Sequence, residues 1–206
     1  MSTINTPVLI VGGGAAGLSA SINLSKLGVD HLLVSSLPYT SKLPKAHVLN
    51  QRTMEIFTEM GFSDRVYEQS TPADNMKATG WYAGVAGDHP RTGARLGHLE
   101  VWGGGYTDPD YIAASPCRTC NLPQLRLEPI MLDHARKIHP DGADGVRFNH
   151  EVTDINQDAT GVTAVVLNKD TDETYTVTSQ YAIAADRGRT VGPKLGVGYT
   201  GDTDLM

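Results

Sequence analysis

The apolar positions at the start of the chain predict a strand, a helix and a second strand in close succession. Residues 7–11 form a short continuous apolar run, which is typical of a buried parallel strand. After a run of glycine and alanine, apolar residues recur at helical spacing from Leu18 to Leu27, and Gly28 sits where such a helix would end. Residues 29–34 then indicate a second strand. The pattern is a strand–turn–helix–strand unit with its glycines in the first turn.

The rest of the chain mixes helical and strand patterns. A helix is predicted over 51–60, with Asn50 at its start and Gly61 at its end, and another over 126–138. Further strands are predicted at 76–83, 96–102, 146–155, 162–167, 175–178 and 181–185. Turn residues separate the stretches after residue 145, which favours a small antiparallel β-meander. We therefore expect an α/β protein with a parallel central sheet and this meander.

Composition and charge narrow the class of protein. The chain has 206 residues, of which 40% are hydrophobic and 19% charged, as in folded globular proteins. Its net charge of −6 argues against a nucleic-acid partner. Cys117 and Cys120 are the only cysteines, which excludes a disulfide framework and makes a zinc site improbable, so we expect no metal. No membrane-length apolar run or secretory leader is visible, so we expect a cytoplasmic protein without a membrane partner.

The strongest chemical signal is the spacing of Gly12, Gly14 and Gly17. In this motif the first glycine permits a tight turn, the second lets the backbone approach a pyrophosphate, and the third lets helix and strand pack closely. Ala15 and Ala16 begin the helix, whose N-terminus offers N–H groups and the positive end of its dipole. Because the motif follows a strand and opens a helix, it predicts a dinucleotide-binding loop rather than an ordinary glycine-rich turn.

The end of the second strand lacks the acidic residue that usually accompanies such a loop. That residue binds a ribose 2′-hydroxyl about 20 residues further on, and here the position is Ser35, followed by Ser36. A serine hydroxyl can still hydrogen-bond a ribose, but without the strength that a charge adds. The alternative of NADP, held by a base beside the strand, has little support because the nearest base along the sequence is Lys42.

Four motifs in order resemble those of a known family. They are the glycine loop and residues 43–55 (LPKAHVLNQRTME), 121–129 (NLPQLRLEP) and 184–189 (AADRGR). Together they resemble the FAD-dependent aromatic hydroxylases, which are single-component flavoprotein monooxygenases, and within them the phenol and chlorophenol hydroxylases. The resemblance covers nearly the whole chain, as the N-terminal part of a longer pattern. It implies a Rossmann-like FAD-binding fold, FAD as cofactor, NAD(P)H as electron donor, and insertion of one oxygen atom from O₂ into a small phenolic substrate.

The resemblance also implies roles for matching positions. The glycine loop would bind the FAD pyrophosphate, and Lys45 stands where the family usually has an arginine facing that group. Gln124 matches a glutamine at the flavin end, and Asp186 matches the aspartate of a second fingerprint near the ribose and pyrophosphate. Arg187 occupies the glycine position of that fingerprint, where we expect a side chain to strain the turn or crowd the cofactor. No catalytic acid or base is identified.

The sequence stops before the family's third FAD motif and most of its substrate-binding region. We therefore expect residues 1–206 to be one FAD-binding domain of a truncated or shortened relative, with doubtful activity alone, that associates with another copy or a partner chain. Two alternatives stay open. Ser35 and Arg187 favour a non-catalytic accessory module that binds FAD weakly, and a non-redox enzyme, such as a cyclase or isomerase, could reuse the cofactor cleft.

Overall fold

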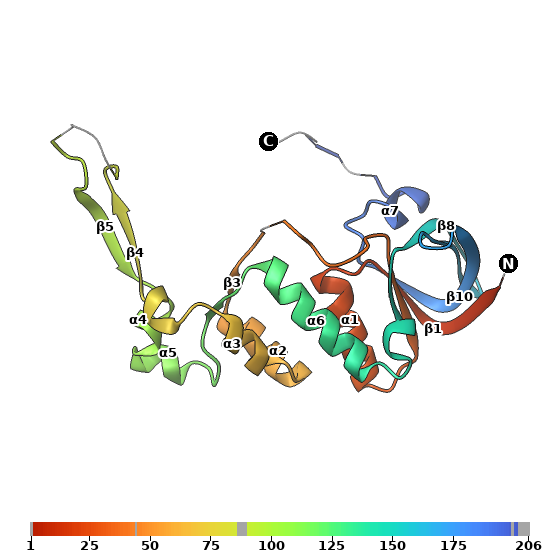
Figure 1. The fold of residues 1–206 in the computed structure, drawn as a ribbon, viewed down its shortest axis with the longest axis horizontal. Helices are drawn as coiled ribbons and strands as arrows, with labels where there is room; N and C mark the ends of the chain where they lie inside the picture. Colours follow the sequence, from red (N-terminus) through yellow and green to blue (C-terminus); the bar gives the residue numbers. More distant parts are fainter. Residues whose placement is uncertain (1, 44, 86–89, 199, 202–206) are drawn as a thin grey trace. The chain divides into compact units, whose positions relative to one another are not determined.

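The computed structural model describes residues 2–43, 45–85, 90–198 and 200–201. They form two compact units (Figure 1): residues 1–43 and 128–206 make up the first, and residues 44–127 the second. The first unit carries the central sheet, and the second carries short helices and two small sheets. Among the described residues, no helix has the length and apolar character needed to cross a bilayer.

A six-stranded sheet in the order β7-β2-β1-β10-β9-β8 organises the first unit. Its strands are β1 (Thr3–Val11), β2 (His31–Ser35), β7 (Val146–Phe148), β8 (His150–Asp158), β9 (Gly161–Asn168) and β10 (Glu173–Ala184). The first four in the order are parallel to one another, and β9 runs antiparallel to both of its neighbours. The expected α/β fold with a parallel sheet and an antiparallel meander is confirmed. Because parallel strands end at the same edge, the loops after β1, β2 and β10 meet there.

The strand β10 joins two stretches that the sequence pattern separates. It pairs antiparallel with β9 from Glu173 to Ser179, and parallel with β1 from Thr176 to Ala184. The sequence predicts two strands here because the polar pair of Ser179 and Gln180 interrupts the apolar pattern. The continuous strand makes the meander part of the central sheet, and it delivers the segment after Ala184 to the same edge as the glycine loop.

The helices of the first unit are α1, part of α6 and the short α7. The helix α1 (Ala15–Lys26) packs on β1 and β2, and its chain leaves through Gly28, which has the left-handed φ of 69°. The helix α6 (Gln124–Ile138) extends from the second unit into the first, where the Arg136 side chain near its end donates to the carbonyl of Val146 at 3.1 Å. A short 3₁₀ turn, η2 (Gly142–Asp144), and the helix α7 (Val191–Lys194) complete this unit.

A buried apolar cluster on the sheet holds the first unit together. Its members come from five strands and α7: Leu9, Val11, Leu32, Val34, Val152, Ile155, Ala164, Val166, Tyr175, Val177 and Val191. Alternate residues of a strand face opposite sides, so the cluster takes every second residue of β1 and β2. This packing holds the ends of those strands in register at the edge where the loops meet.

The second unit contains the predicted helix α2 (Gln51–Met60). Asn50 caps it by accepting a hydrogen bond from the Thr53 N–H at 2.8 Å, and Gly61 ends it with φ of 93°, so both predicted ends are confirmed. The other elements are β3 (Val48–Leu49), α3 (Ser63–Gln69), η1 (Ala73–Met76), β4 (Ala78–Tyr82), β5 (Arg95–Glu100), α4 (Trp102–Tyr106), α5 (Pro109–Ala113) and β6 (Cys120–Asn121). The strands β4 and β5 overlap the strands predicted at 76–83 and 96–102, and they pair antiparallel, which the sequence pattern did not predict.

Candidate functional site

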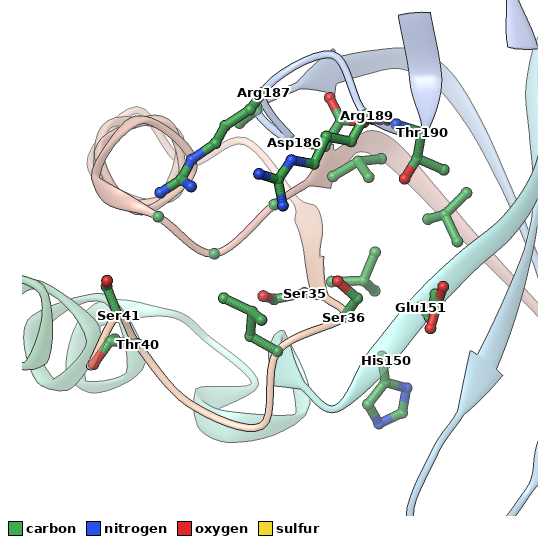
Figure 2. Close-up of a pocket in the computed structure, with 18 of the residues that line it drawn as sticks. Ser35, Ser36, Thr40, Ser41, His150, Glu151, Asp186, Arg187, Arg189 and Thr190 are labelled. Carbon is green, nitrogen blue, oxygen red and sulfur yellow. Dashed lines mark hydrogen bonds between the residues drawn. The ribbon is translucent and has the colours of Figure 1, made fainter. Parts of the chain in front are cut away.

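A pocket of about 180 Å³ lies at the carboxyl edge of the sheet in the first unit (Figure 2). The loops after β1, β2 and β10 line it, together with the first residues of β8 and Glu128 at the start of the first unit's part of α6. Open α/β sheets bind ligands at this edge, because the loops that follow neighbouring strands diverge there and leave a crevice.

Two glycines of the loop are required by the packing of the protein itself. Gly12 has φ of 116°, and a Cβ there would collide with the carbonyl oxygen of Ala185. A Cβ on Gly17 would collide with the carbonyl oxygen of Gly12. These glycines therefore allow the tight turn and the close approach of α1 to the loop, whatever the pocket holds.

Gly14 differs from these two glycines, because the protein's packing leaves room for a side chain there. Among the described residues, a Cβ on Gly14 would meet only the Oε1 atom of Glu128, at an ordinary contact distance of 3.7 Å. Gly14 lines the pocket and has φ of −82°, which any residue adopts. The open space in front of this glycine is thus available to a ligand that approaches the backbone.

The start of α1 presents an electropositive end beside this space. Gly14 is the N-cap, and Ala15 and Ala16 are the first helical residues. Within the described part of the chain, no side chain caps this helix and its first turn has no acidic residue. The first N–H groups of a helix lack partners within the helix and carry the positive end of its dipole, so this end is suited to an anion.

A basic side chain lies next to the end of β2, although it comes from a distant part of the sequence. Ser35 is buried there and lines the pocket with Ser36. Lys169, directly after β9, donates to the carbonyl oxygen of Ser36 at 3.1 Å and forms an ion pair with Glu151 at 3.4 Å. The sequence analysis named Lys42 as the nearest base because it counted positions along the sequence only. The pairing of strands from distant parts of the chain brings Lys169 and Glu151 here, and no local motif indicates it.

Asp186 lines the pocket but uses its carboxylate to hold a turn. Its oxygens accept hydrogen bonds from the N–H groups of Gly188 at 3.0 Å, Thr190 at 2.6 Å and Val191 at 2.8 Å. Burial opposes ionisation of this carboxyl, but the hydrogen bonds outweigh burial and lower its pKa. The carboxylate is therefore ionised at neutral pH, and it organises the loop between β10 and α7.

Arg187 adopts the left-handed conformation that the family's glycine would favour, with φ of 61°. This region costs most residues with a side chain about 1–2 kcal/mol, so the strain expected from the sequence is present in the backbone. Arg187 and Arg189 both line the pocket, and Figure 2 shows their guanidinium groups extending from the loop that follows β10.

Lys45 and Gln124 belong to the second unit, whereas the pocket is formed by the first unit alone. Within the second unit, the segments that carry them are adjacent. The Gln124 N–H donates to the carbonyl of Ala46 at 3.0 Å, and the Leu122 N–H donates to that of His47 at 2.8 Å. Backbone hydrogen bonds therefore join the motif at residues 43–55 to the motif at residues 121–129, almost 80 residues further along the sequence.

The two cysteines lie in the second unit, outside the pocket. Cys117 and Cys120 are buried free thiols, and burial raises the pKa of Cys120, so that thiol keeps its proton at neutral pH. No group of three or more His, Cys, Asp or Glu side chains among the described residues could hold a metal ion.

Comparison with known proteins places this geometry in a family. The chain matches the family model of the FAD binding domain over residues 5–206. It is 39% identical over 189 residues to 2,4-dichlorophenol 6-monooxygenase of Delftia acidovorans, covering 90% of this chain and 30% of that protein. It is 36% identical over 192 residues to phenol 2-monooxygenase of Pseudomonas sp. (strain EST1001), covering 91% and 30%. The chain thus spans less than a third of the length of these two relatives.

Solved structures agree with these matches. The crystal structure of the flavin-dependent monooxygenase PieE, in complex with FAD and substrate, has a TM-score of 0.84 and 39% identity, covering 100% of this chain and 34% of that one. The p-nitrophenol 4-monooxygenase PnpA of Pseudomonas putida DLL-E4 has a TM-score of 0.76 at 24% identity and shares the fold. Since the family match covers nearly the whole chain and phenol monooxygenases share more than a third of its residues, this chain belongs to the FAD-binding domain family.

Proposed function

We propose that the chain holds the ADP half of FAD in the pocket of the first unit, as the cofactor-binding part of an NAD(P)H-dependent monooxygenase that acts on a phenolic ring. The open backbone at Gly14 is the observation that carries the proposal. Packing requires glycine at Gly12 and Gly17 but not at Gly14, and the absence of a side chain at Gly14 leaves the backbone open to an approaching ligand. The named activities of the relatives support the phenolic substrate.

The residues around the pocket fit an adenosine diphosphate. The N-terminus of α1 suits the doubly charged pyrophosphate, which the backbone can reach because Gly14 has no side chain. The Ser35 hydroxyl would hydrogen-bond the ribose in place of a carboxylate. Asp186 would act on the cofactor indirectly, by holding the loop after β10 against Gly12.

The family resemblance implies cofactor roles for Lys45 and Gln124, which belong to the second unit. Lys45 would supply a positive charge to the pyrophosphate, but lysine lacks the planar fork with which arginine bonds two phosphate oxygens at once. Gln124 would contact the flavin end of the cofactor. Both assignments follow the family resemblance, and the hydrogen bond between Gln124 and Ala46 supports a shared surface for them.

The chemistry itself would come from the cofactor. Bound FAD would supply the redox chemistry of a monooxygenase, in which two electrons from NAD(P)H and one O₂ give one oxygen atom to the phenolic ring and release the other as water. The residues of this chain would bind and orient the cofactor. No side chain among the described residues is assigned a proton-transfer step.

The substitution Gly14→Val tests the cofactor site. A side chain there blocks the approach of a pyrophosphate, so we expect FAD and ADP affinity to fall at least a hundredfold in calorimetric titration. The chain should stay folded by circular dichroism, because the site has room for added atoms and replacing a glycine N-cap costs about 1 kcal/mol. Gly198→Val is the matched control, since Gly198 does not line the pocket and a Cβ there meets no atom of the described residues within 4 Å.

Two results would contradict this proposal. Unchanged FAD and ADP affinity in Gly14→Val would show that the loop is only structural. A wild-type chain that stays colourless and ignores added FAD would favour the accessory or non-redox alternative.

A further inference from the structure

The loop after β10 brings two positive charges to the glycine loop. The Ala185 N–H donates to the carbonyl of Val11 at 2.8 Å, and the Ala185 carbonyl lies so close to Gly12 that a Cβ there would collide with it. The chain continues from this contact into Arg187 and Arg189, whose exposed side chains line the pocket (Figure 2). Both guanidinium groups are thus attached within a few residues of the backbone that would face a pyrophosphate.

The carboxylates of the pocket are already engaged by other groups. Glu128 accepts the Ser41 N–H at 2.8 Å, Glu151 pairs with Lys169 at 3.4 Å, and Asp186 accepts three backbone N–H groups of its own loop. Their negative charge is therefore partly compensated within the protein. With the α1 N-terminus and two arginines beside it, the pocket favours an anionic ligand.

The backbone at Arg187 supports a functional reason for this side chain. The residue holds φ of 61°, a conformation that glycine adopts freely and other residues rarely. The turn that imposes it is held by the hydrogen bonds to Asp186. Backbone strain of this kind is found preferentially at sites that clamp ligands, where the side chain must stand at a particular place.

We propose that Arg187, supported by Arg189, binds the diphosphate of the nucleotide cofactor. The family's second fingerprint has glycine at this position, so the contact would be specific to this chain. A guanidinium can bond two phosphate oxygens at once, which gives a shorter and stronger hydrogen bond than neutral groups give. It would compensate for Ser35, which lacks the charge of the usual ribose-binding acid. This inference rests on the proposed cofactor site.

The test measures ADP binding by calorimetry in the wild type, Arg187→Ala, Arg187→Lys and Arg187→Gly. Loss of one hydrogen-bonded charge should weaken ADP binding about tenfold in Arg187→Ala. Arg187→Lys should keep part of the affinity, because it keeps the charge. Arg187→Gly removes both the charge and the strained φ, so it should bind ADP as weakly as Arg187→Ala while melting at an equal or higher temperature. Lys137→Ala, which removes an exposed charge outside the pocket, is the matched control and should leave ADP affinity unchanged.

The outcomes separate this inference from the proposed function. A wild type that binds neither FAD nor ADP would overturn both. A wild type that binds ADP, with Arg187→Ala or Arg187→Gly binding equally or more tightly, would overturn the role of Arg187 alone and leave the cofactor site standing. Equal loss in the alanine and lysine variants, accompanied by a lower melting temperature, would assign Arg187 a structural role and would also overturn the inference.

Discussion

Residues at the carboxyl edge of the sheet play different physical roles, even where they belong to the same motif. Gly12 and Gly17 prevent collisions within the protein, and Gly14 leaves an approach open. Asp186 matches a family position for the cofactor, yet its oxygens bond the backbone of its own loop. A residue type at the right spacing therefore predicts where a site lies better than it predicts which atoms touch the ligand.

Another residue-scale feature, the buried His31, makes stability depend on pH. His31 begins β2, and its ring lies 2.8 Å from the Ser21 Oγ and 2.9 Å from the Val29 carbonyl oxygen. Burial is the largest influence on this ring and lowers its pKa, and nearby His139 lowers it further, although the Val29 carbonyl and Asp30 oppose them.

We expect acid to weaken the fold through this histidine. Because the folded pKa is below the unfolded value of about 6.5, the unfolded chain binds more protons as the pH falls through that value. The free energy of unfolding should therefore be constant near pH 8 and decrease below about pH 6.5, by about 1.4 kcal/mol for each unit of pKa shift. His31→Gln should flatten this slope in urea unfolding measured from pH 5 to 8, and an unchanged slope would contradict the assignment. Some slope should remain, since burial also lowers the pKa of His150.

At the scale of elements, the sequence predicts a helix or strand correctly where residues at its two ends mark its boundaries. The helix α2 has a capping asparagine and a terminal glycine, and both act as the sequence predicts. The residues of α4, from Trp102 to Tyr106, all have positive φ, so this segment is a left-handed turn. The sequence does not predict it, because the segment has no periodic apolar pattern. Its central positions, residues 103–105, are all glycine, which adopts this conformation without steric cost.

The cap of α2 gives a prediction at this scale. Asn50→Ala removes the acceptor for the Thr53 N–H and should lower the free energy of unfolding by about 1 kcal/mol. Asn50→Asp keeps an acceptor and should cost little, so it is the control. Chemical denaturation of both variants measures the difference, and equal stability of the alanine variant and the wild type would show that the cap contributes nothing.

At the scale of the whole molecule, the site depends on three strand ends that come from distant parts of the chain. The loops after β1, β2 and β10 all belong to the first unit, so a ligand there should stabilise that unit at several places at once. A ligand present at a hundred times its dissociation constant adds about 2.7 kcal/mol to the stability of the state that binds it.

Hydrogen exchange measures this coupling. With saturating ADP, we expect slower amide exchange at residues 12–17 and 185–191 together, because both loops would contact the diphosphate. The helix α3 in the second unit provides an internal reference that should exchange at the same rate with and without ADP. Protection of the glycine loop alone would show that the loop after β10 does not take part.

The sequence by itself determined the features that short-range patterns encode. The strand–loop–helix unit around Gly12 and the ends of α2 are predicted from the sequence because each depends on residues a few positions apart. The family is recognised from four motifs, each of them local, by their order along the chain. The family further implied FAD, and the comparisons agree.

Only the tertiary structure decided what long-range strand pairing brings together. Ser36 meets Lys169, 133 positions away, because β10 joins the meander to the parallel strands. The place where β10 ends likewise decides two features of the following loop. Arg187 has a left-handed backbone, and the Asp186 carboxylate accepts hydrogen bonds from its own loop. Such contacts have no local signature, since their energy comes from atoms that are neighbours only after the sheet has formed.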